Sequence, residues 1–149
     1  MVNIPKDFKE FLQLLNDKKV EYLIVGGYAV GYHGHPRSTG DIDIFVSTTV
    51  ENARLLVQCL AEFGFEQLGI SMDDLTKSDH VIQLGYPPLR IDILTAIDGV
   101  TFSDAWRSRI TETIDGLTLH IISLRHLIEN KRASNRLQDA ADIAELDQG

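Results

Sequence analysis

The sequence contains a single cysteine, Cys59, so the chain cannot form an internal disulfide. So few thiols fit a reducing compartment, and we expect a cytoplasmic protein. No apolar run approaches the roughly 20 residues that a membrane-spanning helix needs, so we expect no membrane partner. The first residues, MVNIPKDFKEF, lack the apolar stretch of a secretion signal. Positive charge is also scarce, because 14 Lys and Arg face 22 Asp and Glu. This balance argues against broad, non-specific binding to nucleic acid.

Composition and periodicity predict one α/β (α+β) domain over residues 1–149. Apolar residues make up 44% of the chain and charged residues 24%, which is ordinary for a globular protein. We expect a mixed sheet of about four to six strands flanked by helices. The expected strands are Tyr22–Val25, Asp41–Val46, Val81–Leu84, Leu89–Leu94, Arg109–Ile114 and Leu117–Ile121. The expected helices are Pro5–Lys19, Tyr28–Gly34, one capped at 47–49 and ended by Gly64, Ser123–Ala133 and Leu137–Leu146, with residues 68–79 an irregular loop.

The segment DIDIFV contains the first candidate site. Side chains alternate between the two faces of a strand, so Asp41 and Asp43 share one face and the isoleucines share the other. Two carboxylates this close repel each other unless a cation lies between them. Hard oxygen ligands favour Mg²⁺, with Mn²⁺ as an alternative. A lone Asp-x-Asp is weak evidence, because such pairs are often solvated at strand ends.

A third carboxylate and a glycine pair extend this site. Asp92 lies between isoleucines in the strand LRIDIL, and if this strand neighbours the first, three carboxylates meet at one sheet edge. Three such groups can hold two divalent ions, which clamp the attacking and leaving oxygens of a phosphoryl displacement. Gly26 and Gly27 follow a buried strand and open a helix, and bare backbone N–H groups there suit a polyphosphate. The reaction that uses these parts transfers a nucleoside monophosphate from a nucleoside triphosphate (NTP) to an acceptor hydroxyl and releases pyrophosphate.

The order of these motifs resembles the nucleotidyltransferase (polymerase-β-like) superfamily over residues 22–142, which implies a minimal nucleotidyltransferase fold. More narrowly, the spacing and the segment Arg37-Ser38-Thr39 resemble the AbiE-type toxin branch, named for AbiEii. The resemblance implies that Asp41, Asp43 and Asp92 are catalytic and bind two Mg²⁺ ions. It also implies that the 37–39 segment contributes to nucleotide binding, and that a cognate antitoxin exists as a partner.

The C-terminal stretch NKRASNRLQDAADIAEL resembles the fourth motif of that branch, with Lys131, Arg136 and Asp139 at the matching positions. Lys131 and Arg136 are then expected to bind the nucleotide, and Asp139 is expected to anchor one of these two side chains. Lys131 has independent support, because it continues the apolar stripe of its helix and should point inward. Asp139 could equally be a solvated helix acid. Arg37 could pair with an aspartate or bind phosphate, and Arg90 is expected to pair with a nearby carboxylate.

Three functional hypotheses remain at this point. The first is a Mg²⁺-dependent nucleotidyltransferase of a toxin–antitoxin or phage-defence system, with RNA, tRNA or protein as acceptor. The second is a transferase that modifies a small molecule such as an antibiotic. The third is a catalytically silent nucleotide-binding or antitoxin-like partner. The three acids argue against the third, because a chain released from catalysis has no reason to retain mutually repelling carboxylates.

Overall fold

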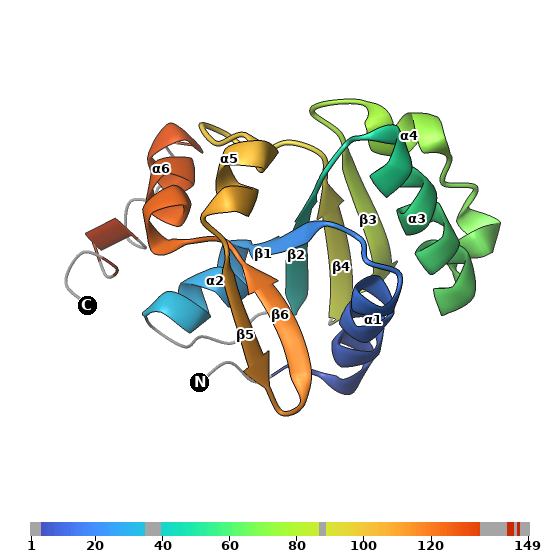
Figure 1. Cartoon of the computed structure of the whole chain (residues 1–149), viewed down its shortest axis with the longest axis horizontal. Helices are drawn as coiled ribbons and strands as arrows, with labels where there is room; N and C mark the ends of the chain where they lie inside the picture. The colour runs from blue at the N-terminus through green and yellow to red at the C-terminus, as the bar shows by residue number, and fades with distance from the viewer. Residues whose placement is uncertain (1–3, 35–39, 87–88, 135–142, 145, 147–149) are drawn as a thin grey trace.

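A six-stranded mixed sheet forms the centre of the computed structural model, which describes residues 4–34, 40–86, 89–134, 143, 144 and 146. The strand order is β3-β4-β2-β1-β6-β5 (Figure 1). The strands are β1 (Tyr22–Val25), β2 (Asp41–Val46), β3 (Val81–Tyr86), β4 (Leu89–Leu94), β5 (Ile110–Ile114) and β6 (Leu117–Ile121). Four of the six predicted strands match in both bounds, and the α+β architecture is confirmed.

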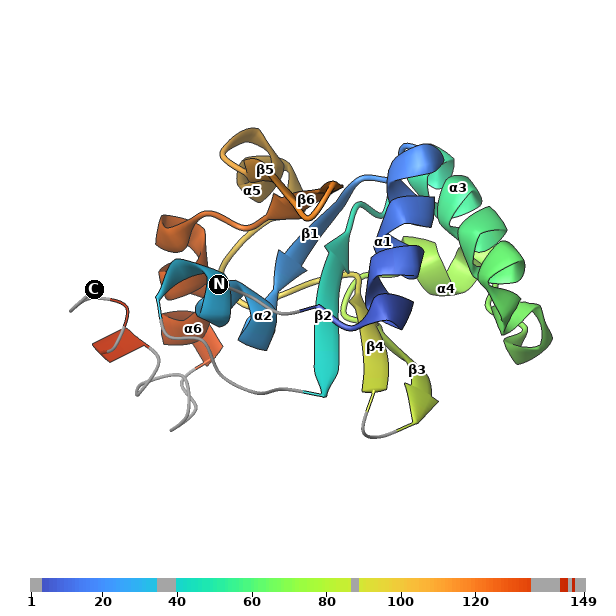
Figure 2. The same cartoon turned by 90° about the horizontal axis from the view of Figure 1, so that it is seen from below.

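Helices cover both faces of this sheet. They are α1 (Lys6–Asp17), α2 (Gly26–His33), α3 (Val50–Leu60), α4 (Met72–Thr76), α5 (Phe102–Arg107) and α6 (Leu124–Ser134). A short π-helix, η1 (Ala61–Phe65), and a 3₁₀-helix, η2 (Glu66–Leu68), follow α3. Figure 2 shows α1, α3 and α4 on one side of the sheet and α2 and α6 on the other. None of the helices described is long and apolar enough to cross a bilayer.

The strand pairing brings together segments that are far apart in the sequence. β2 pairs with β1 in antiparallel fashion, and Val25 lies opposite Asp43. On its other side β2 pairs in parallel with β4, and Asp43 lies opposite Asp92. The two strands that carry the candidate acids are therefore neighbours, which is the condition for the three carboxylates to meet. The alternation along β2 is as predicted, because Ile42 and Ile44 are buried.

Two segments differ from their predicted structure. Residues 68–79 are not a continuous loop, because α4 forms there behind a reciprocal cap between Ser71 and Asp74. This Ser-x-x-Asp spacing is a helix-start signal that the loop prediction passed over. Helix α5 was not predicted at all. Its six residues are too few for a periodic pattern, and it is stabilised by the Thr101 cap and by contact of Phe102 with Phe45 on the sheet.

Helix ends also differ from prediction. Helix α2 begins at Gly26 rather than Tyr28, so both glycines belong to its first turn. Helix α3 ends at Leu60, and the chain continues as η1, in which Gly64 adopts a φ of 104°. The predicted helix at 137–146 lies mostly outside the described residues. Leu146, which is described, is buried.

Asn52, in the first turn of α3, ties together the starting end of β1 and the finishing end of β2. Its Oδ1 accepts from the Glu21 N–H at 2.7 Å, and its Nδ2 donates to the carbonyls of Glu21 at 3.1 Å and Ser47 at 2.9 Å. The residue is only 4% exposed. All three partners are backbone groups at strand ends, where the regular ladder cannot satisfy them.

We predict that Asn52→Ala lowers the free energy of unfolding by about 2–4 kcal/mol, because it leaves these backbone groups unpaired in the interior. Urea denaturation measures the change. Gln13→Ala on the exposed face of α1 is the control and should stay within about 0.5 kcal/mol of wild type. An Asn52→Ala protein as stable as the control would show that water replaces the three bonds.

Candidate active site

Two carboxylates meet at the centre of the candidate site. Asp43 of β2 and Asp92 of β4 occupy directly opposite positions on neighbouring parallel strands. Asp92 is 8% exposed. Asp41 lies two residues before Asp43, on the same face of β2 and opposite Arg90. The fold therefore brings the three predicted acids to one edge of the sheet.

The environment of Asp43 opposes its ionisation. Burial is the largest cause and raises its pKa from 3.8 to about 6, helped by the negative charge of Asp92, a hydrogen bond with the Asp92 side chain, and the charge of Asp41. The positive charge of Lys131 acts in the opposite direction. A carboxyl group in this position gains from any cation that approaches it, since the cation offsets both repulsion and desolvation.

Arg90 provides one such cation. Its Nη2 donates to Asp41 Oδ2 at 2.9 Å, and its Nε donates to Asp92 Oδ1 at 3.0 Å. The guanidinium thus bridges the first and third acids, and the expected ion pair is present. Arg90 donates to Asp41 and Asp92 and not to Asp43, which shares a face of β2 with Asp41 and lies opposite Asp92.

Gly26 allows the start of α2 to approach Asp43 closely. Its φ is +66°, a conformation that side-chain-bearing residues rarely adopt, and a Cβ at this position would lie 2.1 Å from Asp43 Oδ2. A larger residue would therefore displace the carboxylate. The N–H groups of the first helical turn, which includes Gly27, have no partner within the helix and can bind an anion.

Lys131 reaches the same site from α6. It is 5% exposed, which confirms the inward orientation predicted from the apolar stripe. Together with Gly26 and Asp43 it lines a cavity of about 290 Å³. The other lining residues are Val25, Leu94, Ala96, Ile97, Asp98, Asn130 and Ser134. A carboxylate, a glycine helix start and a buried cation around one cavity form a suitable environment for a phosphate group and its counter-ion.

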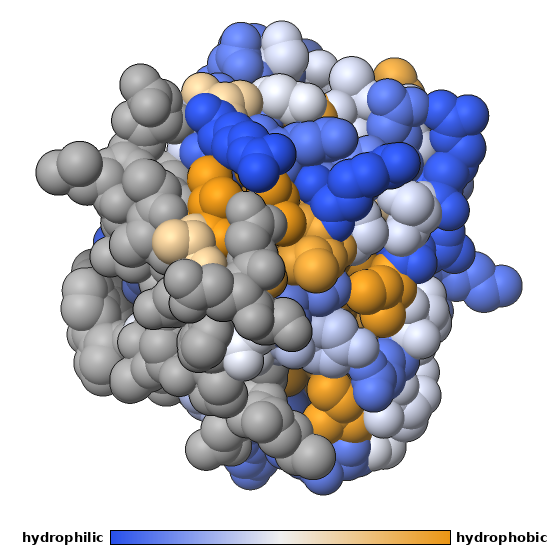
Figure 3. Space-filling view, turned by 90° about the vertical axis from the view of Figure 1, so that its left-hand side faces the viewer, coloured by the Kyte–Doolittle hydropathy of each residue, from blue (hydrophilic) through white to orange (hydrophobic). Residues whose placement is uncertain are grey.

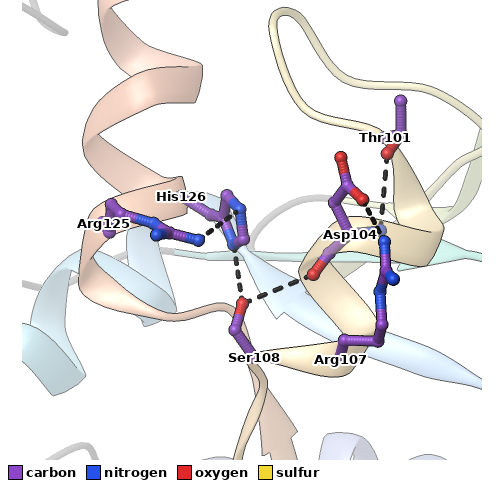
Figure 4. A network of polar contacts seen from close by, with 6 residues as sticks. All are labelled: Thr101, Asp104, Arg107, Ser108, Arg125 and His126. Atoms are coloured by element: carbon purple, nitrogen blue, oxygen red, sulfur yellow. Dashed lines mark hydrogen bonds and ion pairs between the residues drawn. The ribbon is translucent and has the colours of Figure 1, made fainter.

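A polar network fixes α6, the helix that carries Lys131, against α5 (Figure 4). The buried His126 contacts Ser108 Oγ through Nδ1 at 2.9 Å and Arg125 Nη2 through Nε2 at 3.3 Å. Arginine can only donate, so Nε2 accepts and Nδ1 carries the proton that Ser108 accepts. Ser108 in turn donates to the Asp104 carbonyl at 3.4 Å. This tautomer makes His126 a structural donor, not a base acting on Ser108.

The remaining predicted nucleotide-binding residues, Arg37, Ser38, Thr39 and Arg136, lie outside the described residues, as does Asp139, and their roles stay predictions. Within the described part of the chain, no group of three or more His, Cys, Asp or Glu side chains already has a metal-binding arrangement. In this arrangement Asp41 and Asp92 are both paired with Arg90. The cavity residues Asp98, Asn130 and Ser134 were not predicted from the sequence, because no local motif marks them.

The surface on this side of the molecule is mixed. Figure 3 views the molecule from the side on which α2 and α6 lie, and shows apolar residues gathered between hydrophilic ones.

The pKa of Asp43 predicts a specific effect of pH on stability. Because folding raises this pKa to about 6, the folded protein binds the proton more tightly than the unfolded chain does. Stability is therefore lost as the pH rises through the interval from 3.8 to about 6. In EDTA, Asp43→Asn should equal wild type near the lower limit and exceed it at pH 7 by on the order of 2 kcal/mol.

Urea denaturation at several pH values measures this difference. Asp115→Asn, in the exposed β5–β6 turn, controls for removing one negative charge from the protein. If the Asp43→Asn protein were no more stable than wild type at pH 7, the strain assigned to the two acids would be absent.

Solved structures with a similar fold include three nucleotidyltransferase-like proteins. A protein from Thermotoga maritima, solved as a candidate nucleotidyltransferase, matches with a TM-score of 0.62 and 18% identity, over 95% of this chain and 91% of that one. An antigenic nucleotidyltransferase-like protein from Paracoccidioides brasiliensis gives 0.55 and 18%, over 93% and 72%. The lincosamide antibiotic adenylyltransferase LnuA, solved with lincomycin bound, gives 0.57 and 16%, over 97% and 96%. At these identities the likeness concerns the fold.

The sequence itself places the chain in a family. No curated protein is significantly similar to it. A family model described as "Nucleotidyltransferase of unknown function (DUF6036)" matches residues 2–147, nearly the whole chain. The superfamily predicted from the motif order is thereby confirmed, while the narrower AbiE-type branch stays a prediction. The chain belongs to this nucleotidyltransferase family.

Proposed function

We propose that the protein is a metal-dependent nucleotidyltransferase that moves a nucleoside monophosphate from an NTP to an acceptor hydroxyl. The observation that carries the proposal is the β2–β4 register, which sets Asp43 opposite Asp92 beside the backbone of Gly26. Membership of a nucleotidyltransferase family supports the class of reaction. The acids, the anion-binding helix start and the buried lysine are the groups that such a reaction needs.

The donor set fits divalent metal. Asp43 and Asp92 are adjacent, hydrogen-bonded and mutually repelling, so a cation between them would relieve the cause of the raised pKa of Asp43. Hard carboxylate oxygens suit Mg²⁺ or Mn²⁺. We propose that Asp41, Asp43 and Asp92 hold two ions, with Asp41 and Asp92 released in part from Arg90. Bound metal would neutralise charge on the phosphates and lower the pKa of the acceptor hydroxyl.

The chain's own residues would position the substrate and move the proton. The N–H groups at Gly26 and Gly27 and the ammonium of Lys131 would bind the triphosphate with its α-phosphorus beside Asp43. The acceptor oxygen forms a bond to that phosphorus as the bond to the β-phosphate oxygen breaks, and pyrophosphate leaves. The hydroxyl proton would pass to Asp92. Positioning and charge neutralisation supply most of the catalysis.

Two classes of acceptor have support of different kinds. The resemblance of motif order to the AbiE-type branch favours RNA, tRNA or protein, with a cognate antitoxin as partner, and this is the leading proposal. The second class, a small-molecule acceptor, is supported by the fold shared with LnuA, an antibiotic adenylyltransferase. The likeness covers 97% of this chain and 96% of that one, so the two chains are of similar length. One experiment with fractionated acceptors separates the two.

We predict that α-labelled NTPs and Mg²⁺ transfer label to one of three acceptor fractions: total RNA, protein or small molecules. Asp43→Asn and Asp92→Asn should each reduce transfer by at least about a hundredfold, because each removes a group that stabilises charge at the reacting phosphate. Asp115→Asn should transfer as wild type does. Label in RNA or protein supports the leading acceptor class and label in small molecules the second. Full activity of either acid variant contradicts the assignment of the site.

A second prediction concerns metal binding without turnover. Arg90→Met removes the cation that bridges Asp41 and Asp92, so the metal-free variant should melt roughly 5 °C below wild type. Mn²⁺ should then raise the melting temperature of the variant more than that of wild type, because metal replaces the missing charge. Thermal melts in EDTA and in Mn²⁺ measure both, and Arg54→Met on exposed α3 is the control. Equal Mn²⁺ shifts in both proteins would contradict a site shared by Arg90 and metal.

A further inference from the structure

The cavity beside Asp43 has a second acid that the proposed reaction does not use. Among the described residues that line it, the acidic ones are Asp43 and Asp98. Asp98 lies in the turn that follows β4, on the wall formed with α6, and it is exposed. Among the described residues, none forms a hydrogen bond or ion pair with its carboxylate, whereas its backbone carbonyl accepts a hydrogen bond from α6. An acceptor group on a cavity wall is available to a ligand.

The turn that carries Asp98 is held firmly against α6. Asn130 Nδ2 donates to the Asp98 carbonyl at 3.0 Å. The next residue, Gly99, has a φ of +77°, and a Cβ there would lie 2.7 Å from Ala133 Cβ and 3.3 Å from the Glu129 carbonyl oxygen. Only glycine fits this close approach of turn and helix. The Asp98 carboxylate is therefore presented from a backbone whose position is set before any ligand arrives, which favours selective recognition.

The position of Asp98 in the cavity indicates which part of an NTP it meets. In the proposed reaction the α-phosphorus lies beside Asp43, and the sugar is joined directly to that phosphate. The cavity of about 290 Å³ is at the small end for ligand pockets, so it has room for the part of the nucleotide next to the reacting phosphate. Gly26 and Lys131 line the same cavity, and in the proposed reaction they bind the phosphates. The sugar is then the portion nearest the remaining polar wall.

We propose that the Asp98 carboxylate accepts hydrogen bonds from the ribose hydroxyls and makes the enzyme selective for ribonucleotides over 2′-deoxyribonucleotides. A carboxylate is an acceptor with two oxygens, which matches the two donors of a vicinal diol, and acidic residues recognise ribose in this way in dinucleotide-binding folds. The inference rests on the proposed function, because it takes the position of the α-phosphate from it. It adds the class of nucleotide that the site selects.

Calorimetric titration without an acceptor tests the inference, using the four NTPs and the four matching 2′-deoxy NTPs in Mg²⁺. Wild type should bind each NTP at least about tenfold more tightly than its deoxy counterpart, the effect of one hydrogen bond to a charged group. Asp98→Ala should reduce this ratio to near one by weakening NTP binding alone. Glu129→Gln, an exposed acid of α6 outside the cavity lining, should keep the wild-type ratio.

Each other outcome overturns the inference, and the outcomes separate it from the proposed function. Equal affinities of NTP and deoxy NTP for wild type, or an Asp98→Ala protein that keeps the ratio, overturn the inference alone when label transfer is intact. A change in preference among bases at an unchanged ribose ratio shows that Asp98 contacts the base instead. If no triphosphate binds wild type, the proposed function and the inference fail together.

Discussion

The confrontation of Asp43 and Asp92 across the β2–β4 pair is the constraint around which the rest of the site is arranged. Neighbouring parallel strands hold opposite residues at a fixed spacing, so the two carboxylates cannot move apart without breaking the ladder. Burial makes their charges still more unfavourable, and the raised pKa of Asp43 records this. Two cations offset the repulsion in part: Arg90, which pairs with Asp41 and Asp92, and the buried Lys131 near Asp43. An edge of this kind attracts cations.

The remainder of the fold holds those groups in place. Gly26 lets the start of α2 contact Asp43, and the His126 network holds α6 against α5, so that Lys131 enters the cavity from a fixed helix. Asn52 ties the start of β1 to the end of β2, at the ends of these two strands that lie away from the site. A site built on packed strands and helices is pre-organised, which matters for a reaction whose catalysis is mainly positioning and electrostatics. The clamped turn at Gly99 extends the same principle to the wall of the cavity.

The shared fold restricts the chemistry more than it restricts the acceptor. LnuA and the Thermotoga maritima protein have similar architectures at 16% and 18% identity. Folds host sites, and function has to be argued from the residues of each site. In the function proposed for this chain, those residues are the three acids, the glycine helix start, the buried lysine and the wall with Asp98. A shared scaffold does not determine the acceptor, because the residues that line each site decide which acceptor it binds.

By itself the sequence determined the elements and the faces of their residues. The bounds of β1, β2, β4 and β6, the common face of Asp41 and Asp43, and the inward direction of Lys131 all follow from local periodicity, which two or three turns or a few alternating residues suffice to reveal. Helix α5 could not be predicted in this way, because it is too short to show a periodic pattern. Only the tertiary structure decided that Asp92 faces Asp43, that Arg90 bridges Asp41 and Asp92, and that Asp98 lines the same cavity as Asp43. These contacts join residues distant in the chain, and strand pairing, not local sequence, sets which of them meet.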